Sequence, residues 1–209
     1  MEVDAVEIRV LGCLIEKQRT TPDQYPLSLN SLRLACNQTT NRDPVVEYDE
    51  RMIKAALDRM SHRGWTRFAS GASSRALKYR HLLDEALGLS DPELAVLAVL
   101  MLRGPQTLGE LKQRTERMHR FGSLEEVAQT LESLGGKELA ARLERRPGQK
   151  EERYGQLLGG ETEELGSDPE ELGSDPVRGQ TPGDRFAEFE ARLARLESAF
   201  EDLRARLDA

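Results

Sequence analysis

The sequence predicts a mainly α-helical fold with small β wings: tandem winged helix-turn-helix domains plus a C-terminal coiled-coil helix. Residues 1–158 contain the pattern of three helices followed by a two-stranded hairpin twice. Gly, Ser, Pro, Asp and Glu dominate the following segment, and apolar residues recur at heptad spacing near the C-terminus. We therefore divide the chain into winged-helix units at 1–86 and 87–158, a flexible acidic spacer at 159–183, and a heptad-repeat helix at 184–209.

The first unit begins with apolar residues at helical spacing, which predict a helix over residues 4–18. Ser28 has the position of an N-cap, so a second helix is expected to end near Cys36. A third helix is predicted over residues 49–62, with Met52 among its core positions. The segments that follow it up to Leu82 predict a β-hairpin.

The second unit repeats this order. Ser90 precedes a proline near the first turn of a helix that ends at Gly104, and Thr107 and Ser123 have the positions of caps for two further helices. A second hairpin is predicted to turn at Pro147-Gly148. The copies align without gaps in two stretches, 56–60 with 130–134 and 78–83 with 153–158.

The C-terminal region differs in composition from both units. The heptapeptide EELGSDP occurs at residues 163–169 and again at 170–176, in a segment that buries too little apolar surface to fold. Beyond it, large apolar residues alternate steps of three and four, as in a coiled-coil seam that joins two copies in a homodimer. These self-association residues are Phe186, Phe189, Leu193, Leu196, Phe200, Leu203 and Leu207. The alternative, that this helix packs on its own chain, stays open.

Charge is distributed unevenly along the chain. The net charge is −7, yet residues 1–158 carry 24 Lys and Arg against 23 Asp and Glu, and residues 159–209 carry 6 against 14. The acidic average therefore describes the tail and does not argue against nucleic-acid binding. Between residues 59 and 83 there are six Lys and Arg, two histidines and no carboxylate.

This basic run, with the outer face of the third helix, is the candidate DNA-binding surface. In a DNA-binding winged helix the third helix enters the major groove and the hairpin touches the backbone. The candidate residues are Arg51, Lys54, Arg59, Arg63, Arg67, Arg75, Lys78 and Arg80. The alternative interpretation is that these residues form a solvated surface whose charges happen to have one sign. Trp65, within the basic run, is expected to pack in the core.

The third helix of the second unit has a different outer face. Glu125 and Glu126 would repel phosphates there, and Gln129, Thr130 and Ser133 are expected beside them. This unit suits a protein contact, dimerisation or a scaffolding role better than a groove of DNA. The function we expect is DNA binding of the transcriptional-regulator type through the first unit. The alternative is a protein–protein adaptor, similar in architecture to segregation-and-condensation protein B.

Several stretches of the sequence resemble those of a known family. The stretch TTPDQYPLSLNSLRLACNQTTNRDPV at residues 20–45, LGLSD at 87–91, LRGPQT at 102–107 and RPGQKE at 146–151 resemble, in this order, the YceH-like family of uncharacterised bacterial proteins. The resemblance spans residues 5–158. It implies a tandem winged-helix architecture, in agreement with the internal repeat, and it implies no activity.

We expect no catalytic activity, no cofactor and no metal site. No glycine-rich phosphate-binding loop is present, and the three histidines lie in no metal-binding pattern. Cys13 and Cys36 are in apolar contexts that indicate buried thiols. No apolar run reaches the roughly 20 residues needed to span a bilayer, and the acidic N-terminus does not resemble a signal peptide. A cytoplasmic protein is therefore expected.

Overall fold

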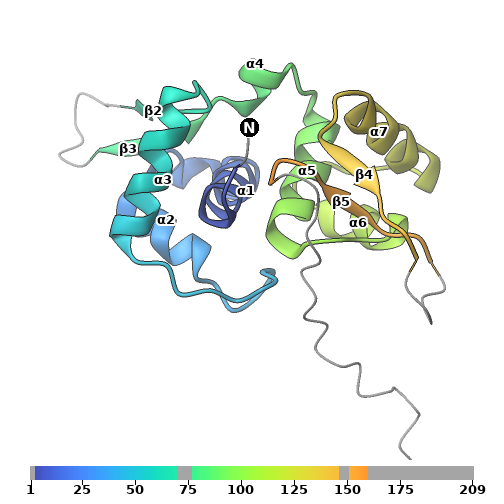
Figure 1. Cartoon of the computed structure of the whole chain (residues 1–209), viewed down its shortest axis with the longest axis horizontal. Helices are drawn as coiled ribbons and strands as arrows, with labels where there is room; N and C mark the ends of the chain where they lie inside the picture. The colour runs from blue at the N-terminus through green and yellow to red at the C-terminus, as the bar shows by residue number, and fades with distance from the viewer. Residues whose placement is uncertain (1–2, 70–76, 146–150, 160–209) are drawn as a thin grey trace, which may run out of the picture. The chain divides into compact units, whose positions relative to one another are not determined.

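The computed structural model describes residues 3–69, 77–145 and 151–159. These residues belong to one compact unit, Met1–Glu164. Within them the chain forms seven α-helices, one 3-10 turn and two small antiparallel sheets (Figure 1). The prediction of a mainly helical fold with small sheets is confirmed.

The first half places its helices close to the predicted positions. Its elements are α1 (Ala5–Thr20), the 3-10 turn (Pro22–Gln24), β1 (Leu27–Ser28), α2 (Leu29–Cys36), α3 (Glu50–His62), β2 (Thr66–Ala69), β3 (Lys78–His81) and α4 (Leu83–Leu87). The side chains of Asp4, Ser28 and Asp49 each accept a hydrogen bond from a backbone N–H in the first turn of a helix. These bonds satisfy donors that the start of a helix leaves without partners, and they explain where α1, α2 and α3 begin.

The second half repeats the order of helices and strands. Its elements are α5 (Asp91–Arg103), α6 (Leu108–Thr115), α7 (Leu124–Gly136), β4 (Ala140–Arg142) and β5 (Tyr154–Gln156). Thr107 and Ser123 accept N-cap hydrogen bonds, as predicted. The backbone N–H of Ser90, the N-cap residue of α5, donates to the carboxylate of Glu93.

Each hairpin also pairs with a segment that precedes the second helix of its half. In the first half the strand order is β1-β3-β2, with Leu27 opposite Tyr79. In the second half a single antiparallel bridge joins Gln106 to Tyr154 of β5. The sequence did not predict β1, because two residues are too few to show an alternating pattern. The internal repeat therefore extends to the sheets.

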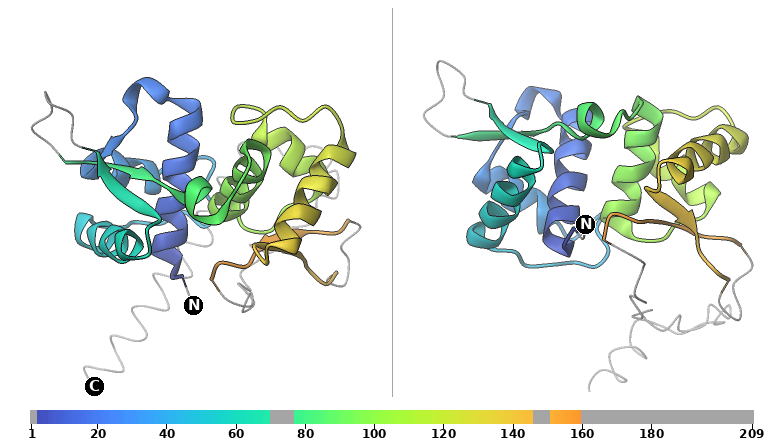
Figure 2. Two further views of the ribbon diagram at one scale, coloured as in Figure 1. Left: turned by 90° about the horizontal axis from the view of Figure 1, so that it is seen from above. Right: turned by 45° about the horizontal axis from the view of Figure 1, so that its top comes forward.

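Helices α1 and α5 lie side by side, and their buried residues form one continuous core (Figures 1 and 2). Gly12 of α1 lies against Leu102 and Met101 of α5. A Cβ atom built there would lie 2.9 Å from Cγ and Cδ2 of Leu102 in α5. The two halves therefore share a core across a close contact between two helices.

Three predicted side-chain environments can be compared with the structure. Trp65 is buried, as expected. Met52 was expected in the core but is 41% exposed, because it lies in the first turn of α3, before the buried stripe that begins at Ile53. Thr130 was expected to face solvent but is buried, and its hydroxyl donates to the carbonyl oxygen of Glu126 one turn earlier in α7.

Candidate nucleic-acid interface

The β2–β3 hairpin gathers basic side chains on one face. Arg67 lies directly opposite Arg80 in the antiparallel register, and Ala69 lies opposite Lys78. Because alternate residues of a strand point to the same face, Arg67, Lys78 and Arg80 share the outer face of the hairpin. Arg80 forms an ion pair of 2.9 Å with the exposed Glu85, whereas Arg67 and Lys78 form none with the residues that the structure describes. This face is therefore strongly cationic.

The outer face of α3 contributes two further basic residues. Arg51 is exposed and forms no ion pair within the described ranges. Lys54 donates to both carboxylate oxygens of Asp58, at 2.6 and 2.8 Å, and this hydrogen bond raises the pKa of Lys54. A solvent-exposed ion pair one turn apart contributes little to stability, so Lys54 can exchange Asp58 for another anion.

Arg59 and Arg63, near the end of α3, are engaged within the protein. Both donate to Oε1 of Glu7, at 3.3 Å from Nε of Arg59 and at 3.0 Å from Nη1 of Arg63. Glu7 is only 1% exposed, and Arg59 also pairs with Asp4. The guanidinium of Arg63 lies 5.7 Å from the centre of the Trp65 ring. These two arginines therefore fasten α3 to the start of α1.

Some predicted site residues lie outside the described part of the chain. Arg75 is one of them. The same holds for the seven predicted self-association residues: Phe186, Phe189, Leu193, Leu196, Phe200, Leu203 and Leu207. The eight predicted DNA-binding residues thus fall into the hairpin face, the α3 face, the pair bound to Glu7, and Arg75.

His81 is part of the inner face of the hairpin and is buried. Its Nε2 lies 2.6 Å from Oε1 of Gln18, and its Nδ1 accepts the backbone N–H of Leu83 at 3.3 Å. Burial lowers the pKa of His81 to about 4, although the carboxylate of Asp84 acts in the opposite direction. A ring whose Nδ1 accepts a hydrogen bond is neutral, so His81 adds no charge to the surface.

The loop between α2 and α3 is held by its polar side chains. Asn37 accepts the backbone N–H of Tyr48 and donates to its carbonyl oxygen, both at 2.9 Å. Arg42 is buried and binds both carboxylate oxygens of Glu16, at 3.1 and 2.6 Å. Burial raises the pKa of Glu16, but hydrogen bonding and the charge of Arg42 outweigh it and leave that pKa lowered. Asn37 and Arg42 are therefore structural residues that hold this loop in place.

The corresponding face of the second half is acidic. Glu125, Glu126 and Gln129 of α7 are exposed, as expected. Glu125 and Glu132 form no ion pair with any residue in the described ranges. The pKa of Glu125 is lowered by backbone and Ser123 hydrogen bonds at the start of the helix. This face would repel a phosphate backbone.

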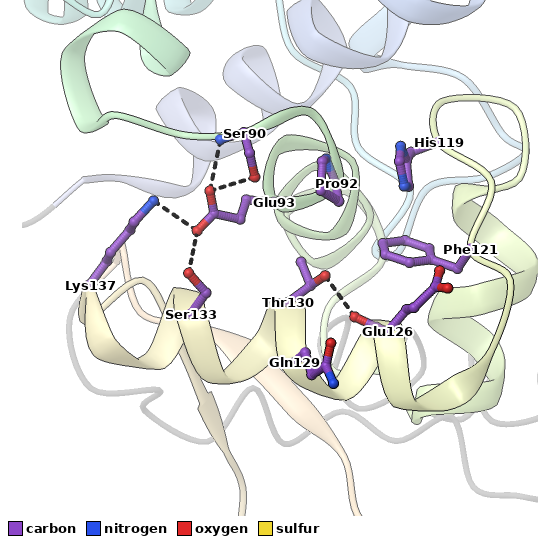
Figure 3. A pocket seen from close by; sticks show the side chains of 10 residues that line it. All are labelled: Ser90, Pro92, Glu93, His119, Phe121, Glu126, Gln129, Thr130, Ser133 and Lys137. Atoms are coloured by element: carbon purple, nitrogen blue, oxygen red, sulfur yellow. Dashed lines mark hydrogen bonds and ion pairs between the residues drawn. The ribbon is translucent and has the colours of Figure 1, made fainter.

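A shallow pocket of about 370 Å³ lies between the start of α5 and α7 (Figure 3). Glu93 is buried at its edge and accepts hydrogen bonds from the Ser90 hydroxyl at 2.7 Å, the Ser133 hydroxyl at 2.8 Å and the Lys137 ammonium at 2.8 Å. Burial raises the pKa of Glu93, but these bonds more than compensate and lower it to about 2. Because both carboxylate oxygens already have partners, Glu93 serves to join α5 to α7.

The two cysteines are buried and unpaired by any disulfide, as the sequence indicates. Cys36 lies within hydrogen-bonding reach of Cys13, and this contact, together with burial, raises the pKa of Cys36. Among the described residues, no three His, Cys, Asp or Glu side chains form a group that could hold a metal ion. No helix in these ranges has the length and apolar character of a membrane span.

Residues 3–149 match the family described as "Protein of unknown function, DUF480". The chain is 49% identical over 206 residues to a UPF0502 protein of Pelobacter propionicus, covering 98% of this chain and 91% of that protein. It is 53% identical over 161 residues to a UPF0502 protein of Geotalea daltonii, covering 76% and 73%. A UPF0502 protein of Serratia proteamaculans is 48% identical over 170 residues, covering 78% and 79%. The expected membership of an uncharacterised bacterial family is confirmed.

Proposed function

We propose that this chain, which belongs to the DUF480 family, is a cytoplasmic DNA-binding protein that regulates transcription. The observation that carries the proposal is the cross-strand pair of Arg67 and Arg80, with Lys78 on the same face. Like charges directly opposite each other destabilise a hairpin. A polyanion on this face would relieve that repulsion, and the DNA backbone presents phosphates at regular spacing.

In this proposal the two halves of the chain are winged-helix units at 1–86 and 87–158. The repeated order of three helices and a hairpin supports this assignment. In winged helices that bind DNA, the third helix lies in the major groove and the hairpin follows the backbone, which gives α3 and the β2–β3 hairpin these roles. We further propose a spacer at 159–183 and a coiled-coil helix at 184–209 that joins two copies.

The geometry narrows the proposed contact residues. Arg59 and Arg63 already bind the buried Glu7, and withdrawing them would leave its carboxylate without partners. The proposed contacts are therefore Arg51, Lys54, Arg67, Lys78 and Arg80, and Arg75 is retained from the sequence alone. If the five contacts that the structure describes each neutralise one phosphate, the log–log salt dependence of affinity has a slope of about −4.5.

Fluorescence anisotropy with a labelled duplex of mixed sequence tests this proposal. Arg67→Ala should weaken binding at low salt and reduce the magnitude of the salt slope by about 1, as expected for one lost phosphate contact. Arg59→Ala is the matched control, since it removes the same charge from a residue that is engaged with Asp4 and Glu7. If wild-type protein does not bind duplex DNA at low salt, or if both variants weaken binding equally, the proposed surface is incorrect.

A second candidate function is that of a protein–protein adaptor. The exposed carboxylates of Glu125, Glu126 and Glu132 on α7 favour it, because they suit a basic protein surface and repel DNA. Pull-down from nuclease-treated lysate distinguishes the two functions. A stoichiometric protein partner that the double variant Glu125→Lys, Glu132→Lys loses would support the adaptor. In both proposals the chain acts by binding and not by catalysis.

A further inference from the structure

The inner face of the β2–β3 hairpin ends in an exposed aromatic ring. Phe68 is 45% exposed, whereas its cross-strand partner Tyr79 is 3% exposed. The two ring centres are 5.2 Å apart and their planes are tilted by 50°. Tyr79 therefore supports the Phe68 ring on one side, and a large part of that ring is left in water. Such an exposed aromatic surface is available to a second planar group.

A basic residue of α3 lies near the two rings. Burial raises the pKa of the Tyr79 phenol, Asp58 raises it further, and the ammonium of Lys54 acts to lower it. Lys54 and Asp58 form an ion pair and neutralise each other. Arg51, three residues before Lys54 on the same helix, is exposed and forms no ion pair within the described ranges. A phosphate that replaces Asp58 as the partner of Lys54 would therefore lie near the aromatic pair.

The second half of the chain provides an internal comparison. The β4–β5 register places Arg142 opposite Tyr154, as β2–β3 places Phe68 opposite Tyr79. With residues 56–60 of α3 aligned to 130–134 of α7, Ala128 of α7 stands where α3 has Lys54. The same framework thus forms without the exposed ring and without the lysine. Neither feature is a requirement of the fold.

We propose that Phe68 stacks on an unpaired base, so that the hairpin and Lys54 of α3 bind single-stranded DNA in addition to duplex. The inference rests on the proposed function and names a further form of DNA that this part of the chain recognises. An aromatic side chain stacks on every type of base, with phosphates held by neighbouring cations. Bases inside a duplex are already stacked on both sides, so the ring gains this contact only where the strand is unpaired.

Anisotropy titrations of full-length protein with a labelled single-stranded oligonucleotide, and with a duplex of equal length, test the proposal. Phe68→Ala should raise the dissociation constant for the single strand about tenfold or more and that for the duplex less than twofold. Phe68→Trp should retain single-strand binding, and the emission of the new indole should be quenched on stacking. Leu124→Ala is the matched control, because Leu124 has the same 45% exposure but lies on α7.

The outcomes separate the two proposals. If wild-type protein binds neither form of DNA, the proposed function fails, and the stacking role fails with it. If wild-type protein binds DNA and Phe68→Ala binds the single strand as tightly as wild type does, only the stacking role is overturned. An equal loss for both forms of DNA also overturns it, because a general disturbance of the hairpin would have that effect.

Discussion

Replacing Gly12 with alanine tests how closely α1 and α5 pack. The added Cβ would lie 2.9 Å from Cγ and Cδ2 of Leu102 and 3.1 Å from Cβ of Met101, whereas carbon atoms pack at about 3.5–4 Å. One helix or the Leu102 side chain must therefore move, and overpacking of this kind costs about 1–3 kcal/mol. Alanine recovers about 1 kcal/mol through its higher helix propensity. We expect Gly12→Ala to lower the free energy of unfolding by about 1 kcal/mol.

Gly109→Ala is the matched control. A Cβ at Gly109, in the first turn of α6, would meet only Oγ1 of Thr107, at an ordinary 3.9 Å. This variant should raise the free energy of unfolding by about 0.5–1 kcal/mol. Urea denaturation can be followed through the fluorescence of Trp65, the single tryptophan, which is buried in the folded chain. A Gly12→Ala protein as stable as the Gly109→Ala protein would refute the close contact between α1 and α5.

Three further predictions concern buried polar groups. The pKa of His81 is about 4 in the folded chain, so the unfolded state alone binds this proton between pH 6.5 and 4. As the pH is lowered through that interval, the free energy of unfolding should fall by up to about 3 kcal/mol. In urea titrations, His81→Gln should not show this part of the decrease. Glu7→Gln should lower the free energy of unfolding by about 3 kcal/mol at pH 7, since Arg59 and Arg63 lose a buried anionic partner; a loss below 1 kcal/mol in the same assay would contradict this. The pKa of Glu93 is about 2, so ionised Glu93 contributes fully to the free energy of unfolding above pH 4.5, and this contribution is lost as the pH falls toward 2. The free energy of unfolding of Glu93→Gln should therefore depend less steeply on pH in this range, as measured by acid unfolding followed by circular dichroism.

Where the signals are local, the sequence predicts the structure well. Ser28, Thr107 and Ser123 each cap the helix that the sequence assigns to them, because the capping bond joins residues only three apart. The buried stripe of α3 follows from its helical periodicity. Met52 is the exception, because periodicity alone does not show how far the core extends toward the end of a helix.

Contacts between distant residues were not predictable in the same way. Glu7 and Arg63 are 56 residues apart, so nothing in the basic run from 59 to 83 shows that its first arginines have an internal carboxylate partner. Arg42 likewise binds Glu16 across 26 residues. A count of basic residues therefore overstates the charge that α3 offers to a ligand. The hairpin, by contrast, offers more concentrated charge than a count of basic residues shows, because the register of β2 and β3 brings Arg67 and Arg80 together on one face.

The two halves of the chain keep the same kind of core but differ in the charge of their outer faces. Leu57 and Leu131 are buried at corresponding positions of α3 and α7, so both halves keep the same kind of core. On the outer faces, α3 presents Arg51 and Lys54 whereas α7 presents Glu125. Exposed residues contribute little to stability, so folding alone does not require this difference of charge. Our proposals explain it by partners that differ between the halves: a polyanion would bind α3 and its hairpin, and a basic protein surface would bind α7.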